Sequence, residues 1–104
     1  VVPQGYVPLG DEVVFFEVKE VLKVIPNPTN GKWQISFEAL ESDLAVVTLY
    51  NADGNIVFSR NMEVYEGTNV LNMNCDDCEN GIYTIVVKGE KINLAQKVNV
   101  IKNI

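Results

Sequence analysis

Apolar and polar residues alternate with a period of two along several short stretches of the chain. The pattern is clearest between residues 32 and 37, where Trp33, Ile35 and Phe37 are separated by polar residues. Side chains of a β-strand point alternately to its two faces, so this stretch is predicted to be a strand with one buried face. Similar apolar runs predict further strands over residues 21–25, 44–50, 56–58, 70–73, 82–88 and 92–101.

Turn residues separate these predicted strands at short intervals. Asn and Gly readily take the backbone conformations that tight turns between antiparallel strands require. No stretch shows a convincing helical period, and Pro26 cuts short the nearest candidate, residues 19–23. Short strands and frequent turns predict an all-β, immunoglobulin-like antiparallel β-sandwich of about seven strands. The turn signals are Asn30-Gly31, Asn51-Ala52-Asp53-Gly54, Glu66-Gly67, Asn80-Gly81 and Gly89-Glu90-Lys91.

The alternation also predicts which side chains form the core. Residues 44–50 are an exception, because their apolar run is nearly continuous, as in a strand that is covered on both faces. Elsewhere we expect one face of each strand to be buried. The expected core residues are Trp33, Ile35, Phe37, Val47, Leu49, Tyr83, Ile85, Val87, Val98 and Val100.

The beginning of the chain differs from the rest. Residues 1–11 contain prolines and glycines with little periodicity, which is the composition of a linker from a preceding domain. We therefore interpret the chain as a piece of a longer protein, with residues 12–104 as one C-terminal domain. The apolar run 12–19 is either the first strand of this domain or the last strand of a preceding one, and the sequence leaves both open.

Composition and charge disfavour several functions. The chain has 104 residues, of which 47% are apolar, so it is long enough for one domain with its own core. Its 8 basic and 14 acidic residues give a net charge of −6, which argues against nucleic acid or an anionic membrane surface as a partner. No apolar run is long enough to span a bilayer, so direct membrane insertion is not expected.

The sequence offers little for catalysis. It contains no histidine, which removes the commonest general base and the usual partner of a nucleophilic Ser or Cys. It also has no Gly-rich phosphate loop before a helix. We therefore expect no enzymatic activity, no catalytic residue and no cofactor.

Cys75-Asp76-Asp77-Cys78 is the one local feature that suggests specific chemistry. A zinc site would need a second pair of ligands, and a redox centre would need the first Cys at a helix N-terminus. The flanking carboxylates would also raise the pKa of a thiol. Asp76, Asp77 and Glu79 lack the spacing of a calcium loop, so no metal is expected. A local disulfide between Cys75 and Cys78, in an exported protein, fits better.

The segment Ile25-Pro26-Asn27-Pro28-Thr29-Asn30-Gly31 separates the first two predicted strands of the sandwich. Each proline fixes φ near about −65° and favours extended backbone in the residue before it. Asn30-Gly31 then lets the chain turn into the next strand. Local chemistry alone therefore predicts a rigid polar corner between two strands.

This corner resembles the opening motif of the C-terminal sorting domain of the type IX secretion system. Three later segments, Val47 to Gly54, Gly81 to Val87 and Gln96 to Lys102, resemble that family's central strand and turn, its Gly-x-Tyr strand and its closing strand. The resemblance covers residues 21–102. The sorting motif that it implies consists of Pro26, Asn27, Pro28, Thr29, Asn30, Gly31, Gly54, Gly81, Tyr83, Lys97, Val98, Val100 and Lys102.

The resemblance also implies a function and partners. Members of the family lie at the C-terminus of proteins that are exported across the outer membrane of certain Gram-negative bacteria, and the folded domain directs that export. The implied partners are the type IX translocon, an outer-membrane shuttle protein and a cysteine-protease sortase. The cargo would cross the periplasm and end at the cell surface or be secreted. In the family the sortase usually cuts before the domain and attaches the cargo to the cell surface, although some members keep the domain, and both fates stay open for this chain. A cut would be expected around residues 5–11, where the sequence predicts accessible backbone.

The chain departs from the family pattern in three places, which concern the cysteine pair and the two ends. A cysteine pair replaces the usual Leu-Pro loop, and the family usually buries a leucine at the position of Cys78. A buried free thiol at Cys78 is therefore the rival of the disulfide. The lead-in of about twenty residues is also longer than the motif requires, and Asn103-Ile104 follow the expected final Lys.

A second class of function fits the same predicted fold. The chain could be an immunoglobulin-like adhesion or spacer domain of a surface protein, with no role in export. Position in the native protein separates the two, since a sorting signal has to lie at or very near the C-terminus.

Overall fold

The structure is a computed structural model that describes residues 6–9, 12–15 and 21–102, with side chains for residues 21–102. The described residues form strands and contain no helix. The strands are β1 (Tyr6–Leu9), β2 (Glu12–Phe15), β3 (Lys23–Ile25), β4 (Lys32–Ala39), β5 (Asp43–Tyr50), β6 (Ile56–Val64), β7 (Gly67–Asn74), β8 (Gly81–Gly89) and β9 (Asn93–Val100).

The first two strands, β1 and β2, pair with each other in an antiparallel two-stranded sheet. Neither pairs with another described strand, so residues 12–15 add no strand to the sandwich. Residues 1–5, 10–11 and 16–20 lie outside the described part of the chain. The linker over residues 1–11, the domain boundary at residue 12 and the cut around residues 5–11 therefore stay predictions.

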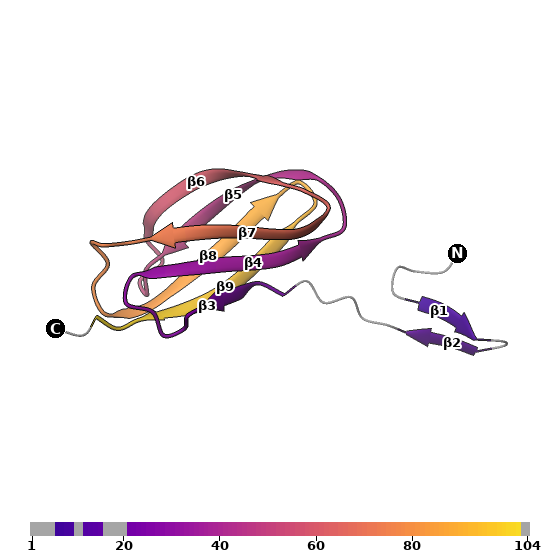
Figure 1. Ribbon diagram of the computed structural model, residues 1–104, viewed down its shortest axis with the longest axis horizontal. Helices are drawn as coiled ribbons and strands as arrows, with labels where there is room; N and C mark the ends of the chain where they lie inside the picture. Colours follow the sequence, from indigo (N-terminus) through magenta and orange to yellow (C-terminus); the bar gives the residue numbers. More distant parts are fainter. Residues whose placement is uncertain (1–5, 10–11, 16–20, 103–104) are drawn as a thin grey trace.

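The other seven strands form two antiparallel sheets that pack face to face as a sandwich (Figure 1). The three-stranded sheet has the order β3-β4-β7, and the four-stranded sheet has the order β6-β5-β8-β9. In an immunoglobulin constant domain the fourth strand belongs to the sheet of the first strand. Here the fourth strand of the sandwich, β6, pairs with β5 in the other sheet. The predicted all-β, immunoglobulin-like sandwich is confirmed.

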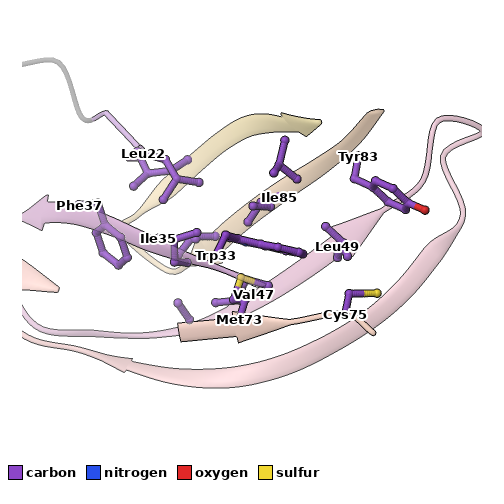
Figure 2. Close-up of a cluster of buried hydrophobic side chains, with 14 of the residues drawn as sticks. Leu22, Trp33, Ile35, Phe37, Val47, Leu49, Met73, Cys75, Tyr83 and Ile85 are labelled. Atoms are coloured by element: carbon purple, nitrogen blue, oxygen red, sulfur yellow. The ribbon is translucent and has the colours of Figure 1, made fainter. Parts of the chain in front are cut away.

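The core lies between the two sheets and contains all ten predicted side chains. On β4, Trp33, Ile35 and Phe37 are buried while the residues between them are exposed or half-buried, as the alternation predicted. Figure 2 shows Trp33 and Ile35 lying among Leu49 and Ile85 of the opposite sheet. The period of two was therefore sufficient to identify the buried face.

The prediction that residues 44–50 are covered on both faces is wrong. Ala45, Val47 and Leu49 of β5 are buried, but Leu44 is 74% exposed and Val46 is 42% exposed. β5 is an inner strand of its sheet, yet no described element packs on the outer face of that sheet. The apolar run reflects a sheet that carries apolar side chains on its open face, not a strand buried in two layers.

The loops of the sandwich gather at two opposite ends. Lys32 at the start of β4 pairs with Asn74 at the end of β7, and Gly81 at the start of β8 pairs with Val100 at the end of β9. We call this end, with the loops 26–31, 51–55 and 75–80 and residues 101–102, the motif end. The opposite end, with the loops 40–42, 65–66 and 90–92, is called the hairpin end.

Candidate functional site: the motif end

The corner that follows β3 carries the chain from one sheet to the other. β3 pairs with β4 in the three-stranded sheet, whereas Thr29 forms a parallel bridge with Val100 on the outer edge of β9. The N–H of Thr29 donates to the carbonyl of Asn99 over 2.8 Å, and the N–H of Ile101 donates to the carbonyl of Thr29 over 2.8 Å. The peptide bonds before Pro26 and Pro28 are both cis. The corner thus fastens the first strand of the sandwich to its last.

The side chain of Asn27 strengthens this attachment in a way that sequence reasoning missed. Its Nδ2 donates to the carbonyl of Lys97 over 3.1 Å, and its Oδ1 accepts from the N–H of Asn99 over 2.9 Å. The amide therefore pairs with β9 as the backbone of a neighbouring strand would. An unpaired sheet edge exposes donors and acceptors that can recruit another chain, and Asn27 satisfies two of them.

Thr29 and Gly31 complete the corner through short-range contacts. The Thr29 hydroxyl is buried, donates to the carbonyl of Lys32 over 2.5 Å and accepts from the N–H of Gly31 over 3.2 Å. Gly31 has φ of +116°, and a Cβ there would lie 3.1 Å from the carbonyl oxygen of Cys75. The N–H of Cys75 donates to the carbonyl of Gly31 over 2.7 Å. Only glycine combines that φ with so close an approach.

The loop 75–80 is held by a disulfide between Cys75 and Cys78. Both cysteines belong to the buried core, so Cys78 also has the burial that the resemblance implied for its position. The hydroxyl of Tyr83 donates to the carbonyl of Glu79 over 2.7 Å and fixes the end of the loop that leads into β8. The described residues contain no free cysteine and no cluster of three residues that could ligate a metal.

Lys102 joins the end of the last strand to this loop. Its N–H donates to Oδ1 of Asn80 over 2.7 Å, and its Nζ donates to the carbonyl of Asp76. Because Thr29 holds the preceding residue, Ile101, the segment after β9 is tied on two sides. The corner, the disulfide loop and the end of β9 therefore form one connected unit.

The turn between β5 and β6 lies at the same end, on the four-stranded sheet. Oδ1 of Asn51 accepts from the N–H groups of Asp53 and Asn55, each over 3.0 Å. Gly54 has φ of +86°, and no atom lies within 4 Å of a Cβ built on it. Glycine is needed here for its backbone conformation and not for close packing.

The structure divides the predicted motif into a buried and an exposed part. Tyr83, Val98 and Val100 are core residues, and the Thr29 side chain is buried as well. Pro26, Asn27, Pro28 and Asn30 are exposed at the corner, as are Gly54 in its turn and Lys97 on the outer face. The motif end therefore presents a surface that is supported directly by the core.

The comparison with known families bears on this end of the molecule. A family model described as the secretion system C-terminal sorting domain matches residues 23–102, which is the sandwich from β3 to the segment after β9. The chain belongs to this family. The sorting domain is of the type IX secretion class, as its motifs predicted. No curated protein matches the chain.

The sorting domain contains a second network, at the hairpin end, that the sequence did not reveal. The Asp43 carboxylate accepts hydrogen bonds from the N–H groups of Leu44, Glu90, Lys91 and Ile92, over 2.8 to 3.3 Å. These bonds, above all the one from Lys91, lower the pKa of Asp43. Gly89 leaves room for this network, because a Cβ there would clash with that carboxylate.

No described helix is long and apolar enough to cross a membrane.

Proposed function

We propose that this sorting domain acts as a folded label that directs an attached cargo across the outer membrane of a Gram-negative bacterium. In this proposal the type IX translocon and an outer-membrane shuttle protein read the domain after the cargo has reached the periplasm. A cysteine-protease sortase then removes the domain and attaches the cargo to the cell surface. The domain itself is a recognition surface and not a catalyst.

The observation that carries the proposal is the convergence of distant segments at the motif end. Asn27 contacts Lys97 and Asn99, Gly31 contacts Cys75, and Lys102 contacts Asn80. These residues are far apart in the sequence and meet only in the folded sandwich. A reader that binds this end would therefore recognise a folded domain and ignore an unfolded chain.

We assign the corner as the part of the motif that the translocon or the shuttle protein binds. Pro26 and Pro28 are exposed, while the residue between them is anchored to β9. A rigid apolar projection of this kind loses little conformational entropy when a partner binds it. The two prolines therefore offer contact area, and Asn27 fixes their position.

The direct test places the 104-residue chain behind an inert cargo in a bacterium that has a type IX system. We expect the cargo at the cell surface or in the medium, and in the periplasm when residues 95–104 are deleted. The deletion would remove Val98 and Val100 from the core and expose the edge of β8. Cargo that reaches the surface equally well without residues 21–104 would refute the proposal and favour a spacer domain.

A second test distinguishes a loss of recognition from a loss of folding. The double variant Pro26→Ala and Pro28→Ala removes the exposed proline rings and leaves the core unchanged, so we expect it to fold and to fail in export. Circular dichroism and thermal unfolding report the fold, and fractionation reports export. Normal export of the folded double variant would remove the corner from the recognition surface.

The sortase step has its own readout. In a strain without the sortase, the cargo should keep the domain and should not be attached to the surface. Removal of the domain at the same position in that strain would assign the cut to another protease.

A further inference from the structure

A shallow groove lies on the outer face of the four-stranded sheet, next to the motif end. It has a volume of about 540 Å³. Three segments that are distant in the sequence form it: the end of β5 with its turn, the start of β8, and β9. Its lining residues are Tyr50, Asn51, Ala52, Gly54, Ile82, Thr84 and Lys97.

The walls of the groove are held by hydrogen bonds. Asn51 fixes the turn that forms one wall through its two bonds to backbone N–H groups. On the other side, the carbonyl of Lys97 accepts from Asn27, whose Oδ1 accepts from the N–H of Asn99. The strand that carries Lys97 is therefore fixed by the corner, which is the part of the motif that we propose the export machinery binds. Rigid walls lower the entropy that a partner loses on binding.

The lining combines apolar side chains with the polar residues Asn51 and Thr84 and one cation. Ile82 is 45% exposed and Tyr50 is half-buried, so both offer apolar surface to a partner. Lys97 is exposed and is the only charged residue of the lining. Within residues 21–102 the structure shows an ion pair between Lys91 and Glu41, at the hairpin end, and none that involves Lys97. Among the residues that the structure describes, no carboxylate therefore pairs with Lys97, and its ammonium group can meet that of a partner.

We propose that this groove is a docking site for a protein loop of the export machinery, with an acidic side chain facing Lys97 and an apolar side chain on Ile82 and Tyr50. Charge complementarity decides the occupant, because an exposed cation on a chain with net charge −6 selects an anionic group. The inference rests on the proposed function and names the part of the surface that discriminates between partners. Gly54 and Lys97 thereby belong to one subsite.

Charge reversal at two positions on the same face tests the docking site. Lys97→Glu changes the groove, and Lys88→Glu makes the same change on the outer face of β8, nearer the hairpin end. In the cargo fusion of the whole chain, we expect Lys97→Glu to lower export roughly tenfold or more, since like charges in contact cost several times the thermal energy. Lys88→Glu should export normally.

An apolar pair gives an independent arm. Ile82→Arg places a cation on the floor of the groove. Leu44→Arg places a cation outside the groove, at a more exposed apolar position at the far end of the same face. We expect only Ile82→Arg to lower export. Circular dichroism and the melting temperature of each purified variant show that the fold is kept. Should Lys97→Glu fail to fold, Lys97→Met, which keeps most of the alkyl stem, is the variant to score, and it should also export less than the natural chain.

The outcomes separate this inference from the proposed function. If folded Lys97 variants export normally, or if both glutamate variants lose export equally, the groove is not a docking site. The proposed function then still stands as long as removal of residues 21–104 abolishes export. If that removal has no effect, the proposed function fails and the groove inference fails with it.

Discussion

At the motif end, side chains and backbone of three separate segments hold one another, whereas at the hairpin end individual side chains hold individual loops. Asn27, Thr29 and Lys102 bond to partners on other strands or loops. Asp43 instead collects three backbone N–H groups of the loop that joins β8 to β9, together with the N–H of Leu44. Both ends use side-chain oxygens to satisfy backbone donors, but only the motif end joins the first strand of the sandwich to the last.

The two ends therefore differ in role: the hairpin end stabilises the fold, and the motif end also holds an exposed surface in place. The bonds at the hairpin end hold the loop that joins β8 to β9. Exposed charged groups there, such as the Lys91–Glu41 pair, contribute little to stability. The motif end fixes exposed prolines and a cation on top of the core. A change at the hairpin end should therefore act through folding alone, and a change at the motif end through folding, recognition or both.

The largest effect is expected from a change in the core, which supports both ends of the sandwich. Val98 of β9 is fully buried, so Val98→Asp would place a carboxylate in the core at a cost of several kcal/mol, about the whole stability of a marginal domain. We expect an unfolded chain by near-ultraviolet circular dichroism. Val46→Asp makes the same change at an exposed position of β5 and should remain folded. A folded Val98→Asp domain would contradict the placement of β9 in the core.

Loss of the disulfide should weaken the motif end next. The double variant Cys75→Ala and Cys78→Ala removes a crosslink over a very short loop, for which chain entropy predicts a loss of about 2 kcal/mol. Chemical denaturation measures this loss, and a reductant should lower the stability of the natural chain but not that of the variant. Rapid thiol labelling of the native, unreduced protein would show that the bond is absent in solution.

A smaller and more local effect is expected from Asn27→Ala. The change removes two hydrogen bonds to β9, together worth about 1–2 kcal/mol at an exposed site. Hydrogen exchange at the amide of Asn99 should become faster, while exchange at the hairpin end stays the same. Asn61→Ala, at an exposed position of β6, is the control and should change neither. Unchanged protection of Asn99 would mean that Asn27 does not hold the edge.

The smallest effect concerns Asp43 and depends on pH. Its pKa is lowered in the folded state, so its bonds stabilise the domain above the pKa of the unfolded carboxyl and lose that effect as the pH falls through the folded pKa. Asp43→Asn should therefore have a lower melting temperature than the natural chain at pH 7. The difference between the two melting temperatures should disappear as the pH falls below about 4. Lys91→Ala keeps the N–H that Asp43 accepts and should change little. A gap that is independent of pH would contradict the role of the charge.

Local patterns predicted the parts of the structure that depend on neighbouring residues. Alternation on β4 identified Trp33, Ile35 and Phe37 as core, and the turn at Gly89 placed the last strand beside β8. The exposure of Leu44 and Val46 was missed, because an apolar run does not show which layer covers a sheet.

The contacts of the candidate site could be predicted only in part. The motif residues were identified by resemblance, and their period of two already indicated that Val98 and Val100 point inward. The bonds of Asn27 to β9 depend on a chain that crosses from one sheet to the other, which no local pattern encodes. The same holds for Asp43, whose main partner lies 48 residues further along the chain.

The parallel bridge between Thr29 and Val100 has a consequence for synthesis on the ribosome. The corner emerges early, but the backbone groups that it binds belong to β9 and emerge last within the sandwich. A chain that stops short of β9 leaves the corner without its partners and the core without two valines. The bridge therefore forms only after β9 has been translated, so only the complete domain presents the surface that we propose for sorting.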